Sequence, residues 1–174
     1  MEKGYLQVYT GNGKGKTTAM LGLTLRACGA GKKVYIGQFI KNYEYSEIKA
    51  LKEFLPQVEI HQYGNGRCLI KKGKGLSQDI ECATNGYNQA LKAVTSGKYD
   101  IVILDEINVA TYLELLDENA VIKLIESRPE QTELILTGRY APQSFIDRAD
   151  LVTEMKEIKH YYNYGVPARL GIEK

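Results

Sequence analysis

The fold is decided by the stretch Gly4-Tyr-Leu-Gln-Val-Tyr-Thr-Gly-Asn-Gly-Lys-Gly-Lys-Thr-Thr18. A short strand with alternating apolar residues runs into a glycine-rich loop that ends in Gly15-Lys-Thr-Thr18, and a helical pattern follows. In a phosphate-binding P-loop, glycines let backbone N–H groups surround an anion, the lysine reaches the terminal phosphates, and a hydroxyl binds Mg²⁺. Thr10 stands where the usual pattern has a glycine. The stretch therefore predicts that the chain binds a nucleoside triphosphate through a variant of the common loop.

The composition is that of a compact globular protein. The 174 residues predict one domain, 1–174, and the 25% charged and 44% apolar residues are ordinary values. A net charge of +2 is too small to indicate a nucleic-acid or anionic-membrane partner. No stretch approaches the roughly 20 apolar residues of a membrane span, and no secretory leader is evident. Cys28, Cys68 and Cys82 lack metal-ligand spacing, so we expect reduced thiols in a cytoplasmic protein.

Strands and helices are expected to alternate along the chain. Strands are predicted at 6–9, 33–39, 58–62, 101–104, 133–137 and 151–155. Helices are predicted at 16–28, 46–54, 78–96, 117–127 and 142–148, with Asp117 as an N-cap and Pro142 in a first helical turn. This alternation predicts an α/β protein with a mostly parallel central sheet of about six strands and helices on both faces. Ligands of such proteins bind at the carboxyl ends of the strands.

A second chemical landmark is Ile101-Val-Ile-Leu-Asp-Glu106. Four aliphatic residues predict a central buried strand, and two carboxylates follow at its carboxyl end. Beside a P-loop, these carboxylates can hold Mg²⁺ directly or through water. The spacing does not decide whether Asp105 or Glu106 reaches the metal.

A third landmark is Leu134-Ile-Leu-Thr-Gly-Arg139, a further buried strand that ends in an arginine. Arginine at this edge of the sheet could bind phosphate oxygens in a bidentate manner. A surface arginine that merely ends a strand explains the pattern equally well.

Together these motifs resemble one family. Besides the Thr10–Thr18 loop, the resemblance is carried by Gly37-Gln-Phe-Ile-Lys41, Leu104-Asp-Glu-Ile-Asn108, Leu136-Thr-Gly-Arg139, Ala149-Asp-Leu-Val-Thr-Glu-Met155 and the pair Lys159-His160. In this order they are similar to the P-loop type of ATP:corrinoid adenosyltransferase, which makes the coenzyme form of vitamin B12. The resemblance covers nearly the whole chain and implies the P-loop NTPase fold of the RecA-like kind.

The resemblance also implies a reaction. Co(I) of a reduced corrinoid attacks C5′ of ATP, inorganic triphosphate leaves, and a cobalt–carbon bond forms. ATP is expected to bind with its triphosphate reversed along the loop, so that C5′ is exposed. The acceptor would be a cobalamin, a cobinamide or an earlier precursor, and a flavoprotein or another reductant would supply Co(I). The resemblance further implies a homodimer.

Site residues are carried over from the resemblance position by position. The triphosphate would be wrapped by the loop residues Gly11, Asn12, Gly13, Lys14, Gly15, Lys16, Thr17 and Thr18. Mg²⁺ would be coordinated by Thr17 and Glu106, with Asp105 in second place, and phosphate would also be contacted by Arg139 and Arg26. Lys16, Thr17 and Glu106 are therefore the expected catalytic residues.

Some features depart from the family or stand apart from the motifs. Well-known members have an N-terminal cover, and a Phe and Trp after the third strand, where this chain has Asn65-Gly-Arg67 and no tryptophan. Tyr43 or Tyr63 could substitute. The basic run that begins at Lys71 favours a solvated loop over a second phosphate site. A further alternative is that Arg67, Lys71, Lys72 and Lys74 edge the corrinoid pocket or face an acidic electron-transfer partner. His160 is a pocket-lining candidate, and the tyrosines of 161–164 suit a macrocycle or a subunit interface equally.

Two other functional classes fit the loop. A small-molecule kinase or NTP hydrolase would use Lys16 and Mg²⁺ on the terminal phosphate, with Glu106 positioning the acceptor. A nucleotide-gated binding module would bind ATP only to order its loops. The products separate these classes, because a kinase releases ADP and an adenosyltransferase releases triphosphate.

Overall fold

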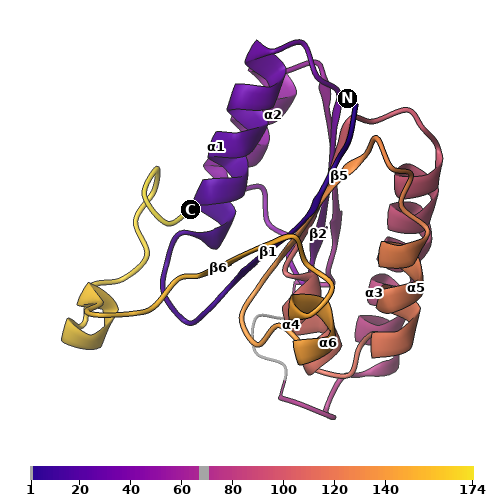
Figure 1. The fold of residues 1–174 in the computed structure, drawn as a ribbon. Coiled ribbons are helices and arrows are strands. Elements are labelled where there is room, and N and C mark those ends of the chain that lie inside the picture. The colour runs from indigo at the N-terminus through magenta and orange to yellow at the C-terminus, as the bar shows by residue number, and fades with distance from the viewer. Residues whose placement is uncertain (1, 67–70) are drawn as a thin grey trace.

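The computed structural model describes residues 2–66 and 71–174 as a three-layer α/β protein (Figure 1). The strands are β1 (Leu6–Thr10), β2 (Val34–Phe39), β3 (Val58–Tyr63), β4 (Ile101–Asp105), β5 (Glu133–Thr137) and β6 (Leu151–Glu154). The helices are α1 (Lys16–Gly29), α2 (Ser46–Phe54), α3 (Ser77–Thr95), α4 (Ile107–Tyr112), α5 (Glu118–Glu126) and α6 (Gln143–Ile146), with a 3₁₀ turn at Tyr161–Tyr164. The predicted α/β fold with a six-stranded parallel sheet is confirmed.

The strand order is β3-β2-β4-β5-β1-β6, and every pair is parallel. β5 therefore lies between β1, which leads into the phosphate loop, and β4, which ends in Asp105. The four inner strands are mostly apolar, and β2, β4 and β5 are buried along their whole length. β6 is an exposed edge strand. The order places the carboxyl ends of β1, β2, β4 and β5 along one edge of the sheet.

Helices cover both faces of the sheet, as the sequence predicted. Figure 1 shows α1 and α2 on one face and α3 and α5 on the other. Each face has its own apolar core, one built around Met20 and Ile36 and the other around Phe39 and Leu104. Parallel strands buried on both sides are mainly hydrophobic, which explains the aliphatic runs in β4 and β5.

Most helix and strand ends lie within two residues of the prediction. Asp117 is the N-cap of α5, as expected, because its side chain accepts a hydrogen bond from the Ala120 N–H at 3.0 Å. α6 is shorter than predicted, and Pro142 precedes it as its N-cap instead of lying in its first turn. α4 was not predicted. In the described part of the chain, no helix is long and apolar enough to cross a membrane.

Two helical glycines should respond in opposite ways to alanine. A Cβ at Gly86 of α3 would lie 2.7 Å from Cγ of the buried Tyr63 ring, so Gly86→Ala should cost about 1–3 kcal/mol of unfolding free energy. Among described atoms, nothing lies within 4 Å of a Cβ at Gly22 of α1, so Gly22→Ala should stabilise by about 0.5–1 kcal/mol. Urea denaturation of both variants checks this prediction. Equal changes in the free energy of unfolding would contradict the close contact between Gly86 and Tyr63.

Candidate active site

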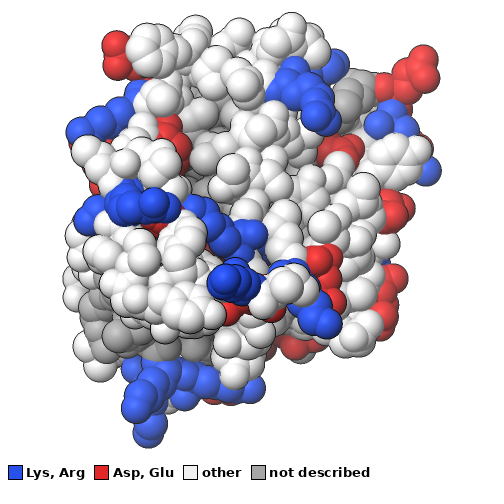
Figure 2. All heavy atoms as spheres, turned by 90° about the vertical axis from the view of Figure 1, so that its left-hand side faces the viewer, with Lys and Arg blue, Asp and Glu red and all other residues white. Residues whose placement is uncertain are grey.

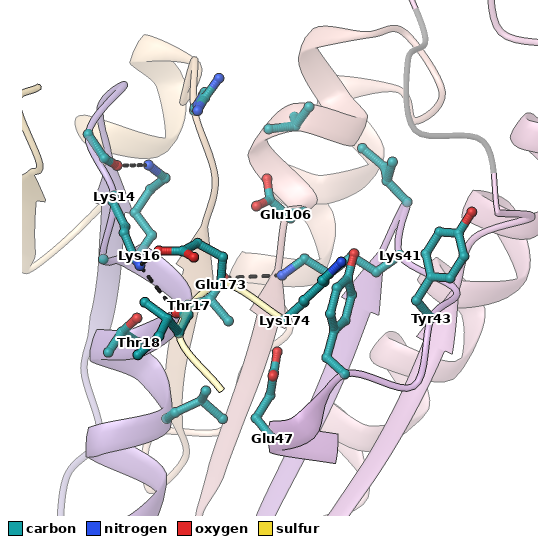
Figure 3. Close-up of a pocket in the computed structure, with 18 of the residues that line it drawn as sticks. Lys14, Lys16, Thr17, Thr18, Lys41, Tyr43, Glu47, Glu106, Glu173 and Lys174 are labelled. Carbon is teal, nitrogen blue, oxygen red and sulfur yellow. Dashed lines mark hydrogen bonds and ion pairs between the residues drawn. The ribbon is translucent and has the colours of Figure 1, made fainter. Parts of the chain in front are cut away.

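A cavity with a volume of about 1070 Å³ opens at the carboxyl edge of the sheet. Its walls come from the phosphate loop and α1, from the segments after β2, β4 and β5, and from the C-terminal residues. Figure 3 shows Lys14, Lys16 and Thr17 on the α1 side and Lys41 and Glu106 on the other. The sheet order thus brings residues far apart in the sequence to one hollow, as expected for parallel α/β proteins.

The phosphate loop has the shape that its glycines allow. Gly11 has a φ of +94°, and a Cβ there would come within 2.4 Å of the Met155 carbonyl oxygen, so only glycine fits. The Gly13 N–H donates to the same carbonyl at 2.7 Å. Residues 13–18 line the cavity, whereas Gly11 and Asn12 are not among its lining residues. The segment after β6 therefore supports the loop from outside.

Lys16 is buried at the start of α1 and folds back over the loop. Its Nζ donates to the carbonyl oxygens of Gly11 at 2.6 Å and Gly13 at 2.7 Å. Burial lowers the pKa of this ammonium, while nearby Glu106 opposes the shift. The first turn of α1 also exposes backbone N–H groups to the cavity, which makes this wall suited to an anion.

Asp105 is fully buried at the end of β4 and is the centre of a hydrogen-bond network. Its carboxylate accepts from Lys41 at 2.6 Å, from Thr137 at 2.6 Å, and from Gln38 and Thr17 at 3.1 and 3.2 Å. Burial alone would raise the pKa of Asp105, but the Lys41 ammonium and these hydrogen bonds hold it below its ordinary value. The network connects the P-loop helix to β4 across the intervening β5.

Lys41 is a site residue whose role the sequence analysis missed. It follows β2, and its Nζ also donates to Thr17 Oγ1 at 3.1 Å. Burial lowers its pKa, but the charges of Asp105 and Glu106 outweigh this effect and the net pKa is raised. Its place at the carboxyl end of a buried strand was the available signal. The missing information was that β2 and β4 are neighbours.

Glu106 has a left-handed backbone conformation, with φ at +62°, and is the N-cap of α4. Its N–H donates to Thr137 Oγ1 at 3.2 Å, and its side chain lines the cavity. Burial and the neighbouring Asp105 raise the pKa of its carboxyl group. Ile40 and Tyr140 also have positive φ, at +67° and +59°, and lie in the cavity-lining segments that follow β2 and β5. Such strained residues cluster at binding sites.

Arg139 and Arg26 have different positions. Arg139 follows β5 and lines the cavity with the loop residues. Arg26 lies exposed in the last turn of α1, ten residues after Lys16 and therefore about 15 Å further along the helix. It is absent from the described cavity wall. We therefore leave Arg26 out of the proposed site.

The C-terminal segment, residues 161–174, forms part of the cavity wall. Glu173 accepts a hydrogen bond from Lys14 Nζ at 2.9 Å and others from Tyr161 and Arg169. These donors lower the pKa of the Glu173 carboxyl group, with Arg169 as the largest cause. Ser46 Oγ donates to the Lys174 carbonyl oxygen at 3.1 Å. The segment thus reaches from the phosphate loop to the start of α2.

Cations outnumber anions along the cavity wall. The cations are Lys14, Lys16, Lys41, Lys71, Lys72, Arg139 and Lys174, and the anions are Glu47, Glu106 and Glu173. Figure 2 shows lysine and arginine side chains crossing the middle of the face that carries the C-terminal segment. His160 also lines the cavity, whereas Lys74 does not, and Arg67 and Cys68 lie outside the described residues. The wall is therefore suited to a polyanionic ligand.

Metal binding can be tested against the oxygen donors present. In the described residues, no cluster of three or more His, Cys, Asp or Glu side chains could hold a metal alone. Mg²⁺, however, is usually held by one or two carboxylates together with substrate phosphates and water. The Thr17 hydroxyl and the Glu106 carboxylate at the cavity wall fit this requirement. Asp105, already bound by four donors, suits an outer position.

Several known proteins similar to this chain are named corrinoid adenosyltransferases. A sequence model described as ATP:corrinoid adenosyltransferase BtuR/CobO/CobP matches residues 2–173. Corrinoid adenosyltransferases of Pseudomonas aeruginosa and Escherichia coli K12 are each 34% identical over 173 residues, which cover 99% of this chain and 84% and 86% of those proteins. One from Sinorhizobium is 34% identical over 175 residues, or 99% of this chain and 81% of that protein.

Proposed function

The chain belongs to the ATP:corrinoid adenosyltransferase family BtuR/CobO/CobP, and from this premise we propose how its cavity performs the family's reaction. The enzyme transfers the 5′-deoxyadenosyl group of ATP to the Co(I) centre of a corrinoid. Two electrons of Co(I) form the cobalt–carbon bond, and the C5′–oxygen bond breaks with its electron pair leaving on triphosphate. No proton has to be removed from the nucleophile. The protein's task is therefore to align C5′ with cobalt and to stabilise the leaving group.

The observation that carries this proposal is a P-loop that opens into a cavity of about 1070 Å³. This volume lies just above the usual range for small-molecule sites, roughly 300–1,000 Å³, as expected for a site that holds a second substrate beside the nucleotide. Lys16, Arg139 and the N–H groups at the start of α1 would contact the triphosphate. Thr18 and Lys14 lie on the same wall. The positive charges of Lys14, Lys16 and Arg139 would stabilise the departing triphosphate more than bound ATP, because negative charge on the triphosphate increases during the reaction.

Thr17 and Glu106 would hold Mg²⁺, and Asp105 would orient Thr17 from the outer position. A bound Mg²⁺ would supply positive charge to the phosphate oxygens. The raised pKa of Glu106 supports this assignment, because a carboxylate that is costly to ionise while buried gains most from a nearby cation. The homodimer and a flavoprotein reductant remain predictions from the resemblance. The single domain 1–174 and a cytoplasmic location remain predictions from length, composition and cysteine usage.

Glu106→Gln should raise the Mg²⁺ concentration needed for half-maximal rate by at least about ten-fold, since even outer partners of a metal site are worth about 10–100-fold. The variant keeps the size of the side chain but removes its charge. Mg²⁺ titrations of the initial rate at saturating ATP check this. Glu47→Gln, on the same cavity wall, is the matched control. An unchanged Mg²⁺ requirement in Glu106→Gln would remove Glu106 from the metal site.

The function itself is tested anaerobically. The protein is mixed with Mg-ATP and a chemically reduced corrinoid, the Co(I) absorbance is followed, and the nucleotide products are separated. We expect a light-sensitive adenosylcorrinoid and one triphosphate per cobalt–carbon bond. ADP and phosphate without a cobalt–carbon product would mean phosphoryl transfer. ATP binding without either product would mean a gated binding module.

A further inference from the structure

Two tyrosines from different elements stack at the rim of the cavity. Tyr112 ends α4 and Tyr140 follows Arg139 after β5, and their ring centroids are 4.3 Å apart with an angle of 30° between the planes. Both rings line the cavity, and the residues are 37% and 50% exposed. Aromatic side chains usually bury their area in a core, so this exposed pair presents apolar surface directly to whatever enters the cavity.

The backbone of Tyr140 is conformationally strained where it positions its ring against Tyr112. Tyr140 has a φ of +59°, a conformation that costs a bulky residue of order 1 kcal/mol or more. It follows Gly138, whose φ of +131° lets the turn pass close to Asn108 and Val109 of α4. A turn that relaxed to an ordinary conformation would aim the Tyr140 ring elsewhere. The strained residue, Tyr140, is therefore the one whose ring stacks on Tyr112.

A lysine adds a charge to the same place. Lys72 Nζ lies 5.1 Å from the centroid of the Tyr112 ring and 3.7 Å from Glu114 Oε1. Lys71 lines the cavity beside it. The rim therefore combines a flat apolar surface with ammonium groups at its edge. This combination fits a large flat molecule that carries oxygen acceptors around its circumference.

We propose that the Tyr112–Tyr140 pair, here called the tyrosine platform, is the surface against which the corrin macrocycle rests, with Lys72 facing its amide and carboxylate side chains. This inference rests on the proposed function and assigns the second substrate a place within the cavity. α4 leads from Glu106 to Tyr112, a rise of about 9 Å, so the platform lies beyond the metal-binding carboxylate. A macrocycle on the platform and phosphates at the loop would place the ribose between them.

The platform is tested by direct binding, independently of turnover. Aquacobalamin is strongly coloured, so its dissociation constant can be measured by equilibrium dialysis, and that of ATP in parallel. Tyr140→Gly removes one ring and leaves a residue that adopts a φ of +59° without strain. It should weaken aquacobalamin binding by about ten-fold, the worth of one good aromatic contact, and leave ATP binding within about two-fold. Tyr140→Phe keeps the ring and should bind both ligands as the wild type does.

The matched control is Tyr5→Ala. Tyr5 immediately precedes β1 and is 46% exposed. It also lies beneath a lysine, with Lys3 Nζ 5.3 Å from its ring centroid, but it is not among the residues that line the cavity. Its loss should change neither affinity.

Unchanged aquacobalamin binding in Tyr140→Gly would overturn the platform. Weakened ATP binding with unchanged aquacobalamin binding would also overturn it, and would assign the rings to adenine. Both results are separate from the reaction test, because wild-type protein that forms adenosylcorrinoid and triphosphate retains the proposed function whichever way the platform experiment ends. Tyr112→Ala provides a second variant from another element, and the same loss of corrinoid affinity is expected.

Discussion

Lys16→Ala should reduce adenosyl transfer by at least about 10²–10³-fold, the usual cost of removing one positioned group that stabilises a developing anion. Lys16 is the buried cation nearest the loop, and it contacts the carbonyl oxygens of Gly11 and Gly13. Its ammonium is already partly desolvated, since burial lowers its pKa. The interaction with triphosphate would therefore be stronger than that of a solvated lysine.

The measurement is the single-turnover rate of Co(I) loss at saturating Mg-ATP. Because Lys16 also donates hydrogen bonds to two carbonyl oxygens of the loop, urea denaturation of the same variant shows whether its loss destabilises the protein. Lys92→Ala, an exposed lysine in the last turn of α3, is the control and should react as the wild type does. A Lys16→Ala enzyme within about ten-fold of the wild-type rate would be incompatible with the assigned role.

Lys41→Met should lower the free energy of unfolding by about 3 kcal/mol, because it leaves the carboxylate of Asp105 buried without its cation. Asp105 is fully buried, and Lys41 lies 2.6 Å from it. The remaining donors Gln38, Thr137 and Thr17 carry no charge. Urea denaturation at neutral pH measures the change. A loss below about 0.5 kcal/mol would show that the pair is solvated and contributes as little as a surface ion pair.

The difference in stability between the wild type and Lys41→Met should depend on pH. In the wild type the pKa of Asp105 is held below its ordinary value, so its stabilising contribution is present above the unfolded pKa of about 3.9 and is lost as the pH falls through the lower folded pKa. In Lys41→Met, burial prevails and the folded pKa is raised, so the cost is greatest at high pH and decreases as Asp105 becomes protonated. The two stabilities should therefore converge from pH 7 toward about pH 4. The double variant Lys41→Met/Asp105→Asn should recover most of the loss at pH 7.

The sequence predicted the sheet, the phosphate loop and the carboxylates because each depends on a local pattern. The aliphatic runs before Asp105 and Arg139 identify buried strands wherever their neighbours lie. α4 was missed because it has six residues, too few for a helical period, and includes Val109 and Thr111, which favour strands.

Long-range contacts were not predictable in this way. Nothing near Lys41 in the sequence indicates that β2 pairs with β4, and this pairing is what brings Lys41 to Asp105. Glu173 lies 159 residues from Lys14, so no spacing rule connects them. Arg26 shows the opposite case, since the family pattern suggested a phosphate contact for a residue that is not among those lining the cavity. Tyr112 and Tyr140 carried no motif.

The strand order also sets the timing with which the site can form during synthesis. Leu6 of β1 pairs with Leu134 of β5, 128 residues later, and Gly13 is hydrogen-bonded to Met155. At about 5–20 residues per second, a ribosome needs roughly 6–25 s to make that intervening chain. The phosphate loop is thus among the first segments translated and among the last to acquire its neighbours. A nascent chain that ends at Gln131 has the complete loop sequence, but it should not retain ATP until β5 and β6 are made.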